Sequence, residues 1–282
     1  MRTAAILLIL LTVTAAPASH KLTAEDSAMS RTPTAMIVVT NQRLREEPIS
    51  PFIYGNFIEF LDHHLQGMRA QMLDDHSFEG TLPPSEWCHY LRDRDIAQHP
   101  WRQTGFGGNA SFEIAEGDAY NGRRCARIIV EQPGSSPCGV LQEGIPLQAD
   151  REYEVLLFLK QNGLQGPVEI ALGKDWGPFF DSYAAATVAD VTESWSKFRV
   201  VLNPNVTAQN AALAIRISSP GALWLDQVTL RPADHIEGWR HDVVEAVKAL
   251  APRMIRFGGS AVNFYDWKIG IGDPDKRPPF PN

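Results

Sequence analysis

Glu59 is the first residue whose type and position suggest chemistry. It lies near the end of the run Phe52-Ile-Tyr-Gly-Asn-Phe-Ile-Glu-Phe60, which is apolar at both alternating positions. This pattern is typical of a strand that is covered on both faces. A carboxylate at the end of such a strand is costly to bury unless it has a partner or a task. Glu59 is therefore a candidate ligand-binding residue.

Aromatic side chains provide a second set of candidates. Trp176 and Phe179 lie in a loop flanked by Gly and Pro, so the sequence supports sugar stacking and ordinary loop packing equally. Trp195 and Trp224 lie in strand-like runs, and we expect them to be core residues.

The three cysteines, Cys88, Cys125 and Cys138, are too few for a scaffold held together by disulfides. The hydrophobic core must therefore stabilise the fold. Cys125 and Cys138 flank a Pro-Gly-Ser-Ser-Pro turn, which leaves two alternatives open. They form a disulfide between neighbouring strands, or they are two buried thiols.

No metal or cofactor site is expected. The cysteines and histidines lack the spacing of a zinc site. Glu113 and Asp226 are too few carboxylates to support a calcium site. Adjacent side chains point apart in regular structure, so His63-His64 is more typical of a surface loop than of a metal site.

Composition limits the class of ligand. The chain has 282 residues, a formal net charge of −7, 44% hydrophobic residues and 21% charged residues, which is typical of a globular protein. The acidic balance and the lack of a Lys/Arg cluster argue against nucleic acid as a partner. A neutral substrate is the simpler expectation.

The N-terminus has the pattern of an export signal. Met1-Arg2 precedes an apolar run over residues 4–13 that is too short to span a bilayer, and Ala16-Pro17-Ala18 resembles a signal-peptidase site. We predict a signal peptide over 1–18 and a flexible polar lead-in over 19–34. No later run reaches about 18 apolar residues. The sequence thus predicts a secreted or periplasmic protein with no membrane contact after signal cleavage.

Residues 100–232 have the pattern of an antiparallel β-sandwich. Short segments rich in β-branched and aromatic residues recur there between Gly, Pro, Asn and Asp, without helical periodicity. Six strands are predicted, over 125–131, 152–160, 168–172, 195–202, 211–217 and 223–230.

Residues 233–282 switch to a helix followed by a strand. Apolar residues recur at helical spacing from Trp239 to Leu250, and Pro252 ends the helix. The short strand 254–257 then runs into Gly258-Gly259, which gives one unit of an α/β layered fold. Because a complete protein rarely stops after starting such a repeat, the sequence suggests a fragment.

Four motifs in this order resemble the start of the family 51 α-L-arabinofuranosidases. They are ISPFIYGNFIEF (49–60), MLDDHSFE (72–79), RFGGS (256–260), and YDWK with IGDPDKRP (265–278). The segment LWLDQV (223–228) looks like the closing strand of a carbohydrate-binding-type sandwich that one branch of the family carries. The resemblance extends from about residue 36 onward.

The resemblance implies a fold and a site. The family's catalytic domain is a (β/α)₈ barrel, so 52–59 within region 35–99 would be its first strand and 253–257 its second, with the sandwich inserted between them. Barrel active sites gather at the C-terminal ends of strands, where Glu59 and Arg256 fall. Their counterparts help to form the sugar pocket. The alternative is a structural ion pair within the barrel.

The sequence also departs from the family pattern. In most relatives the motif is Arg, an aromatic residue, then Pro-Gly-Gly. Here Phe257 is followed directly by Gly258-Gly259, without the proline. The exact sugar preference is therefore in doubt. The family's acid/base residue comes from an Asn-Glu pair, and this chain contains no such dipeptide. No catalytic residue is therefore assigned.

The expected partner is an arabinose-containing polysaccharide or oligosaccharide. The expected function is that of a secreted retaining arabinofuranosidase, represented here by an inactive N-terminal part. The alternative is a stand-alone secreted carbohydrate-binding protein in which the sandwich is the functional unit.

Overall fold

The computed structural model describes residues 46–59, 67–80, 100–259 and 267–277. The signal peptide, the lead-in, His63-His64 and Cys88 lie outside the described residues. Within the described part, no helix is long and apolar enough to cross a membrane.

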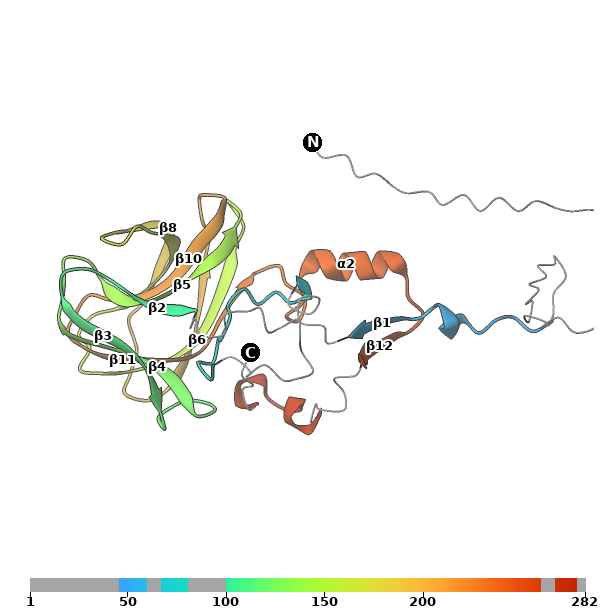
Figure 1. The fold of residues 1–282 in the computed structure, drawn as a ribbon, viewed down its shortest axis with the longest axis horizontal. Coiled ribbons are helices and arrows are strands. Elements are labelled where there is room, and N and C mark those ends of the chain that lie inside the picture. The colour runs from blue at the N-terminus through green and yellow to red at the C-terminus, as the bar shows by residue number, and fades with distance from the viewer. Residues whose placement is uncertain (1–45, 60–66, 81–99, 260–266, 278–282) are drawn as a thin grey trace, which may run out of the picture. The chain divides into compact units, whose positions relative to one another are not determined.

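Residues 101–232 form a sandwich of two five-stranded antiparallel sheets (Figure 1). The first sheet has the order β2-β5-β10-β7-β8, with bounds Trp101–Thr104, Cys138–Leu147, Ala208–Ile217, Val168–Asp175 and Phe180–Val188. The second sheet has the order β3-β4-β11-β6-β9, with bounds Asn109–Glu116, Arg124–Gln132, Gly221–Pro232, Tyr153–Asn162 and Ser196–Leu202.

The six predicted strands are confirmed as β4, β6, β7, β9, β10 and β11. Alternate residues of both sheets point inward and form one continuous core, to which β6 and β10 contribute Val155, Leu157, Leu213 and Ile215. Strands β2, β3, β5 and β8 were not predicted from the sequence. Glycines and exposed polar residues interrupt the apolar pattern of β5 and β8.

Two expectations about buried side chains had different outcomes. Cys125 and Cys138 are both buried and free, so the two-thiol alternative holds and the disulfide does not form. The expectation that Trp195 and Trp224 are core residues is wrong. Both are half-buried on the outside of the second sheet, because Trp224 alternates with the inward-facing Leu223 and Leu225.

On that outer face, the Lys160 ammonium lies between the two indoles. It is 5.1 Å from the Trp195 ring centre and 5.2 Å from that of Trp224, and it pairs with Asp118. The lysine therefore already fills the space between the two rings.

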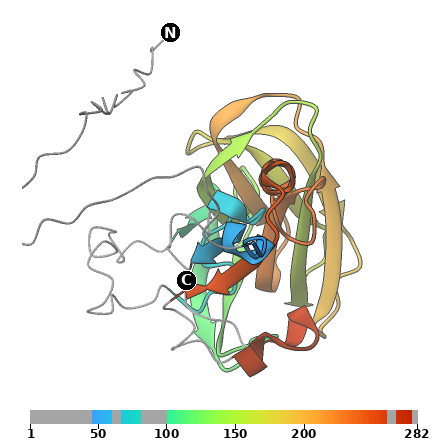
Figure 2. The same cartoon turned by 90° about the vertical axis from the view of Figure 1, so that its right-hand side faces the viewer.

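A second, smaller sheet lies outside the sandwich. Strand β1, Asn56–Glu59, pairs in parallel with β12, Ile255–Gly258, and helix α2, His241–Leu250, precedes β12. Figure 2 shows α2 nearly end-on beside the strands. Parallel strands need a crossover connection, and α2 lies in that connection, as expected of a β/α unit.

The predicted first strand is shorter than expected. Residues Pro51–Tyr54 form a 3₁₀ helix, and the strand begins only at Asn56. Pro51 suits the first helical position, and the Ser50 hydroxyl accepts a hydrogen bond from the Phe52 N–H.

The chain enters and leaves the sandwich along two adjacent paths. The Met72 N–H donates to the Leu230 carbonyl (2.9 Å), the Ala70 N–H donates to Gly238 (2.9 Å), and the Arg240 N–H donates to Met68 (3.0 Å). On the entering path, Leu73 and Phe78 pack into the sandwich core. Residues 68–78 and 228–240 therefore form a hydrogen-bonded neck between the sandwich and the small sheet.

His76, in this neck, gives a pH test of the fold. Burial and the nearby Arg231 and Arg69 lower the pKa of the imidazole from 6.5 to about 4. Below pH 6.5 the His76 imidazole is protonated in the unfolded chain, whereas in the folded protein it stays neutral down to about pH 4. Acidification therefore destabilises the fold.

Between pH 7 and pH 4.5, we expect the free energy of unfolding of the parent protein to fall by about 2 kcal/mol more than that of the His76→Gln variant, which has no imidazole at this position. Urea titrations of both proteins at each pH measure the difference. A difference that stays constant with pH would contradict the assigned environment of His76.

Candidate functional site

The pairing of β1 with β12 brings together the two strands that carry the predicted sugar-binding residues. The register places Phe57 opposite Arg256 and Glu59 opposite Gly258. Because the strands are parallel, their C-terminal ends meet at the same edge. Glu59 and Arg256 thus lie on adjacent strands near that edge.

The two faces of this small sheet differ in chemistry. Ile58 and Ile255 face α2, and the Phe257 ring meets Trp239 edge-on at 6.4 Å. On the other face, the Arg256 guanidinium lies 5.0 Å from the centre of the Phe57 ring. Strand alternation assigns position 59 to this second face as well. Positions 59 and 256 therefore belong to the same face of the small sheet.

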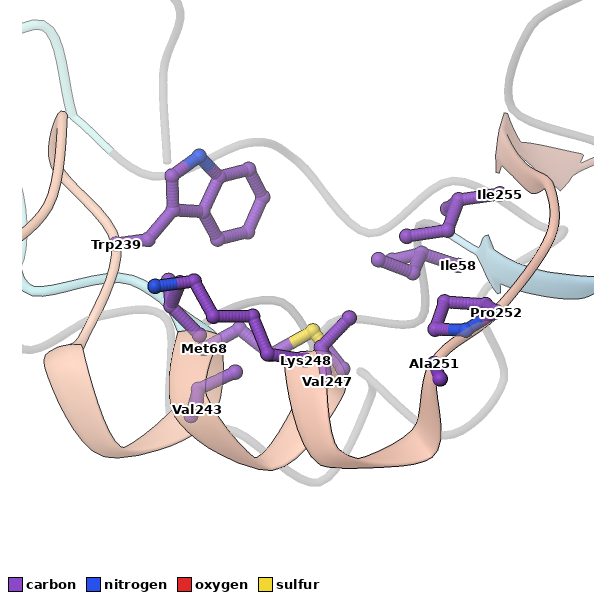
Figure 3. Close-up of a pocket in the computed structure, with 10 residues that line it drawn as sticks. Ile58, Met68, Trp239, Val243, Val247, Lys248, Ala251, Pro252 and Ile255 are labelled. Carbon is purple, nitrogen blue, oxygen red and sulfur yellow. The ribbon is translucent and has the colours of Figure 1, made fainter.

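The face toward the helix is unsuited to sugar. An apolar hollow of about 470 Å³ lies between α2 and the strands, lined by Ile58 and Ile255 on one side and Val243 and Val247 on the other (Figure 3). Lys248 contributes the one charged side chain in this lining. Sugars need several hydrogen-bonding partners, and this hollow offers too few.

A second candidate surface is the outer face of the first sheet. Its floor consists of small or apolar side chains, namely Leu141, Ala212 and Ala214, with Phe180 packed against them. A register shift between Leu172 and Gly173 lets the start of β8 bend over this floor.

Charged side chains surround this floor. Arg102 pairs with Asp175 at 2.7 Å and with Glu143 at 3.2 Å. Arg216 lies over the Phe180 ring at 4.5 Å and pairs with Glu169. Paired charges next to an aromatic ring can offer both hydrogen bonds and a stacking surface to a polar, ring-shaped ligand.

The β7–β8 hairpin extends beside this floor. Trp176 and Phe179 flank its two-residue Gly177-Pro178 turn, and Gly177 has the positive φ of 86° that such turns favour. Both aromatic side chains are 58% exposed. The rings are therefore accessible to a ligand, and their contact with a sugar stays a prediction.

The two carboxylates considered for calcium have other partners. Glu113 pairs with Arg127. Asp226 is fully buried and accepts backbone N–H bonds from Tyr120, Asn121 and Gln227. Burial raises the pKa of Asp226 to about 7 despite these bonds. In the described part of the chain, no cluster of three or more His, Cys, Asp or Glu residues could hold a metal.

Sequence reasoning missed the charged partners on the first sheet. Arg102 is on β2 and Asp175 is at the end of β7, and β5 and β10 lie between these strands in the sheet. Their ion pair therefore crosses the outer face of the sheet, which no sequence pattern indicates. For Arg216 the sequence does hold a weak indication, because it is a charged residue within the otherwise apolar run of β10. A buried arginine on a sheet face needs a partner, and Glu169 provides it.

No protein-family model matches the sequence. An α-L-arabinofuranosidase of Arabidopsis thaliana is 23% identical over 253 residues, which cover 82% of this chain and 35% of that protein. An extracellular exo-α-L-arabinofuranosidase of Streptomyces chartreusis is 24% identical over 256 residues, covering 81% and 28%. A solved arabinose-bound α-L-arabinofuranosidase of family 51 is 18% identical, with a TM-score of 0.60, and the match covers 79% of this chain and 38% of that one.

This chain resembles the N-terminal part of the family 51 α-L-arabinofuranosidases. The expected resemblance is thus confirmed over most of the chain, at low identity. The chain spans only about a third of the length of these relatives. The likeness to the solved arabinofuranosidase concerns the fold.

Gly173 gives a test of the first sheet's outer face. A Cβ at this position would lie 2.1 Å from the Asp181 carbonyl oxygen and 2.6 Å from the Phe180 ring. We therefore expect Gly173→Ala to push β8 and Phe180 off the floor and to destabilise the fold by about 1–3 kcal/mol.

Gly67→Ala is the matched control, because a Cβ there meets nothing within 4 Å. Its effect should stay within about 0.5 kcal/mol. Urea unfolding of the three proteins measures both effects. If Gly173→Ala were as stable as the control, the close packing of Phe180 over this sheet would be wrong.

Proposed function

We propose that this chain is the N-terminal part of a secreted glycoside hydrolase that removes terminal arabinofuranosyl groups from plant polysaccharides with retention of configuration. In this proposal the small sheet is the start of a (β/α)₈ barrel. The sandwich is inserted between its first and second strands.

The parallel register of β1 and β12 carries this proposal. It brings position 59 and Arg256 to one face near the C-terminal edge, which is where a β/α barrel builds its active site. The similarity to arabinofuranosidases over most of the chain agrees with that reading.

The chemistry of the two residues suits a furanose. The Glu59 carboxylate accepts hydrogen bonds from ring hydroxyls, which discriminates against sugars that lack them. Arg256 orients the acidic groups of the site and offsets their charge, since its planar fork matches carboxylates. The Phe57 ring stacks under the guanidinium and limits its rotamers.

Retention requires two carboxylates about 5 to 5.5 Å apart, one as acid/base and one as nucleophile. Glu59 does not fill both roles, and the chain has no Asn-Glu pair to supply the acid/base. Residues 1–282 by themselves should therefore hydrolyse no arabinofuranoside.

Expression of the natural reading frame tests the enzyme proposal with a chromogenic α-L-arabinofuranoside. We expect hydrolysis by the product of the full frame and none by residues 1–282. Arg256→Gln should lower kcat/KM on the order of 100-fold, because it removes a charged partner of the site. Arg253→Gln, an exposed arginine three positions earlier, should stay within about twofold.

Hydrolysis by residues 1–282 alone would refute the assignment of the catalytic carboxylates to the rest of the barrel. A full frame without arabinofuranosidase activity would refute the enzyme proposal itself.

The second candidate function is carbohydrate binding by the sandwich. The observation that favours it is the pair of exposed rings, Trp176 and Phe179, on the β7–β8 hairpin. This hairpin lies beside the outer face of the first sheet, where ion pairs such as Arg102 with Asp175 are found. A rigid turn presents the rings at little conformational cost, and sugar rings stack on aromatic faces.

Affinity electrophoresis of residues 1–282 in gels with arabinoxylan or arabinan tests this function. We expect retardation of the chain, and Trp176→Ala and Phe179→Ala should each weaken it about tenfold, the loss of one stacking contact. Phe106→Ala is the matched control, because Phe106 is also 58% exposed but lies outside this hairpin. Equal loss in all three variants, or no retardation of the parent chain, would refute the binding function.

A further inference from the structure

The sandwich binds residues 267–277, which follow β12, through the contacts of Asn121 and Lys197, which we call the grip. Two short 3₁₀ helices form this segment, Trp267–Gly270 and Pro274–Lys276. The Asn121 side-chain amide donates to the carbonyl of Asp275 at 3.1 Å and to that of Arg277 at 2.5 Å. One asparagine of the sandwich therefore spans the Lys276–Arg277 peptide bond.

Asn121 is itself held rigidly. The buried carboxylate of Asp226, on β11, accepts the backbone N–H groups of Tyr120 (2.9 Å) and Asn121 (3.0 Å). The Tyr120 ring stacks on Phe158 of β6, with 3.7 Å between ring centres. The loop that presents the Asn121 amide is thus bound to the central strand of the second sheet, β11, and to its neighbour β6.

The gripped segment is preorganised on its own side. The Asp273 carboxylate caps the second 3₁₀ helix by accepting the Asp275 N–H at 3.1 Å. The Arg277 guanidinium donates to the Gly272 carbonyl at 2.9 Å. These bonds fix the two carbonyls that face Asn121, so little entropy remains to be lost when the amide binds them.

An ion pair adds to the contact. The Lys197 ammonium of β9 lies 2.5 Å from the Asp275 carboxylate. Both side chains are partly exposed, and exposed pairs contribute little. The Asn121 hydrogen bonds, which are more enclosed, provide the specific part of the contact.

We propose that Asn121 is a positioning residue through which the sandwich fixes residues 267–277 after β12, and that loss of this contact weakens sugar binding. The effect on the sugar site rests on the proposed function, whereas the grip itself does not.

Limited proteolysis of residues 1–282 tests the grip directly. Trypsin cleaves after Lys276, at the bond that Asn121 spans, and cleavage follows the population of the opened segment when opening is fast. We expect Asn121→Ala and the nearly isosteric Asn121→Asp each to speed this cleavage about tenfold, as mass spectrometry of the released C-terminal peptide will measure.

Asn162→Ala is the matched control, because Asn162 is an exposed asparagine at the end of β6. Its cleavage rate should equal that of the parent chain. Thermal unfolding of the sandwich should stay unchanged in all the variants, so faster cleavage cannot be ascribed to global unfolding. Rates within twofold of the parent for both Asn121 variants would overturn the proposal.

The product of the full reading frame tests the effect on the sugar site. There we expect Asn121→Ala to raise KM for the arabinofuranoside about fivefold while kcat changes less than twofold, with partial rescue by Asn121→Gln. Faster tryptic cleavage with unchanged KM would confine the role of Asn121 to the grip and overturn the link to the sugar site. An inactive full-frame product with faster cleavage would refute the proposed function while the grip stands.

Discussion

The parallel pairing of β1 with β12 is the constraint on which the rest of the structure depends. Parallel neighbours cannot be joined by a tight turn, so the chain must cross over, and α2 lies in that crossover. The connection also contains a whole sandwich, which must begin and end at nearly the same place. Backbone hydrogen bonds between Arg240 and Met68 and between Met72 and Leu230 hold the two ends of the sandwich together. The insertion therefore leaves the small sheet free to pair.

The sequence predicted those features that depend on local pattern. Six strands with dense apolar residues were recognisable, and so was the helix ending before Pro252. Strand β5 was missed because Gly139, Gln142 and Gly144 interrupt its apolar pattern. Gln142 is nevertheless buried, because its side-chain amide accepts from the Asp74 N–H and donates to the Asp74 carbonyl. Contacts that reach across the face of a sheet, such as that of Arg102 on β2 with Asp175 on β7, leave no local pattern in the sequence.

The misplaced tryptophans have a physical explanation. Apolar residues at both alternating positions normally indicate a strand covered on both faces, so Trp224 between two leucines suggested burial. The second sheet is indeed covered on both sides, but its outer cover is partial. Tyr120 stacks on Phe158, and Lys160 fills the gap between Trp195 and Trp224. Covering by a loop and a lysine stem leaves the indoles half-buried.

Asp226 shows how one polar residue joins these parts. A carboxylate inside an apolar strand would ordinarily be excluded, because its desolvation is costly. Here it accepts three backbone N–H groups, and one comes from Gln227, whose φ of 51° breaks the regular register of β11. An amide at this position would turn a donor toward one of those N–H groups, whereas a carboxylate accepts all three. The same carboxylate that completes the strand thus fixes the loop from which Asn121 reaches the segment after β12.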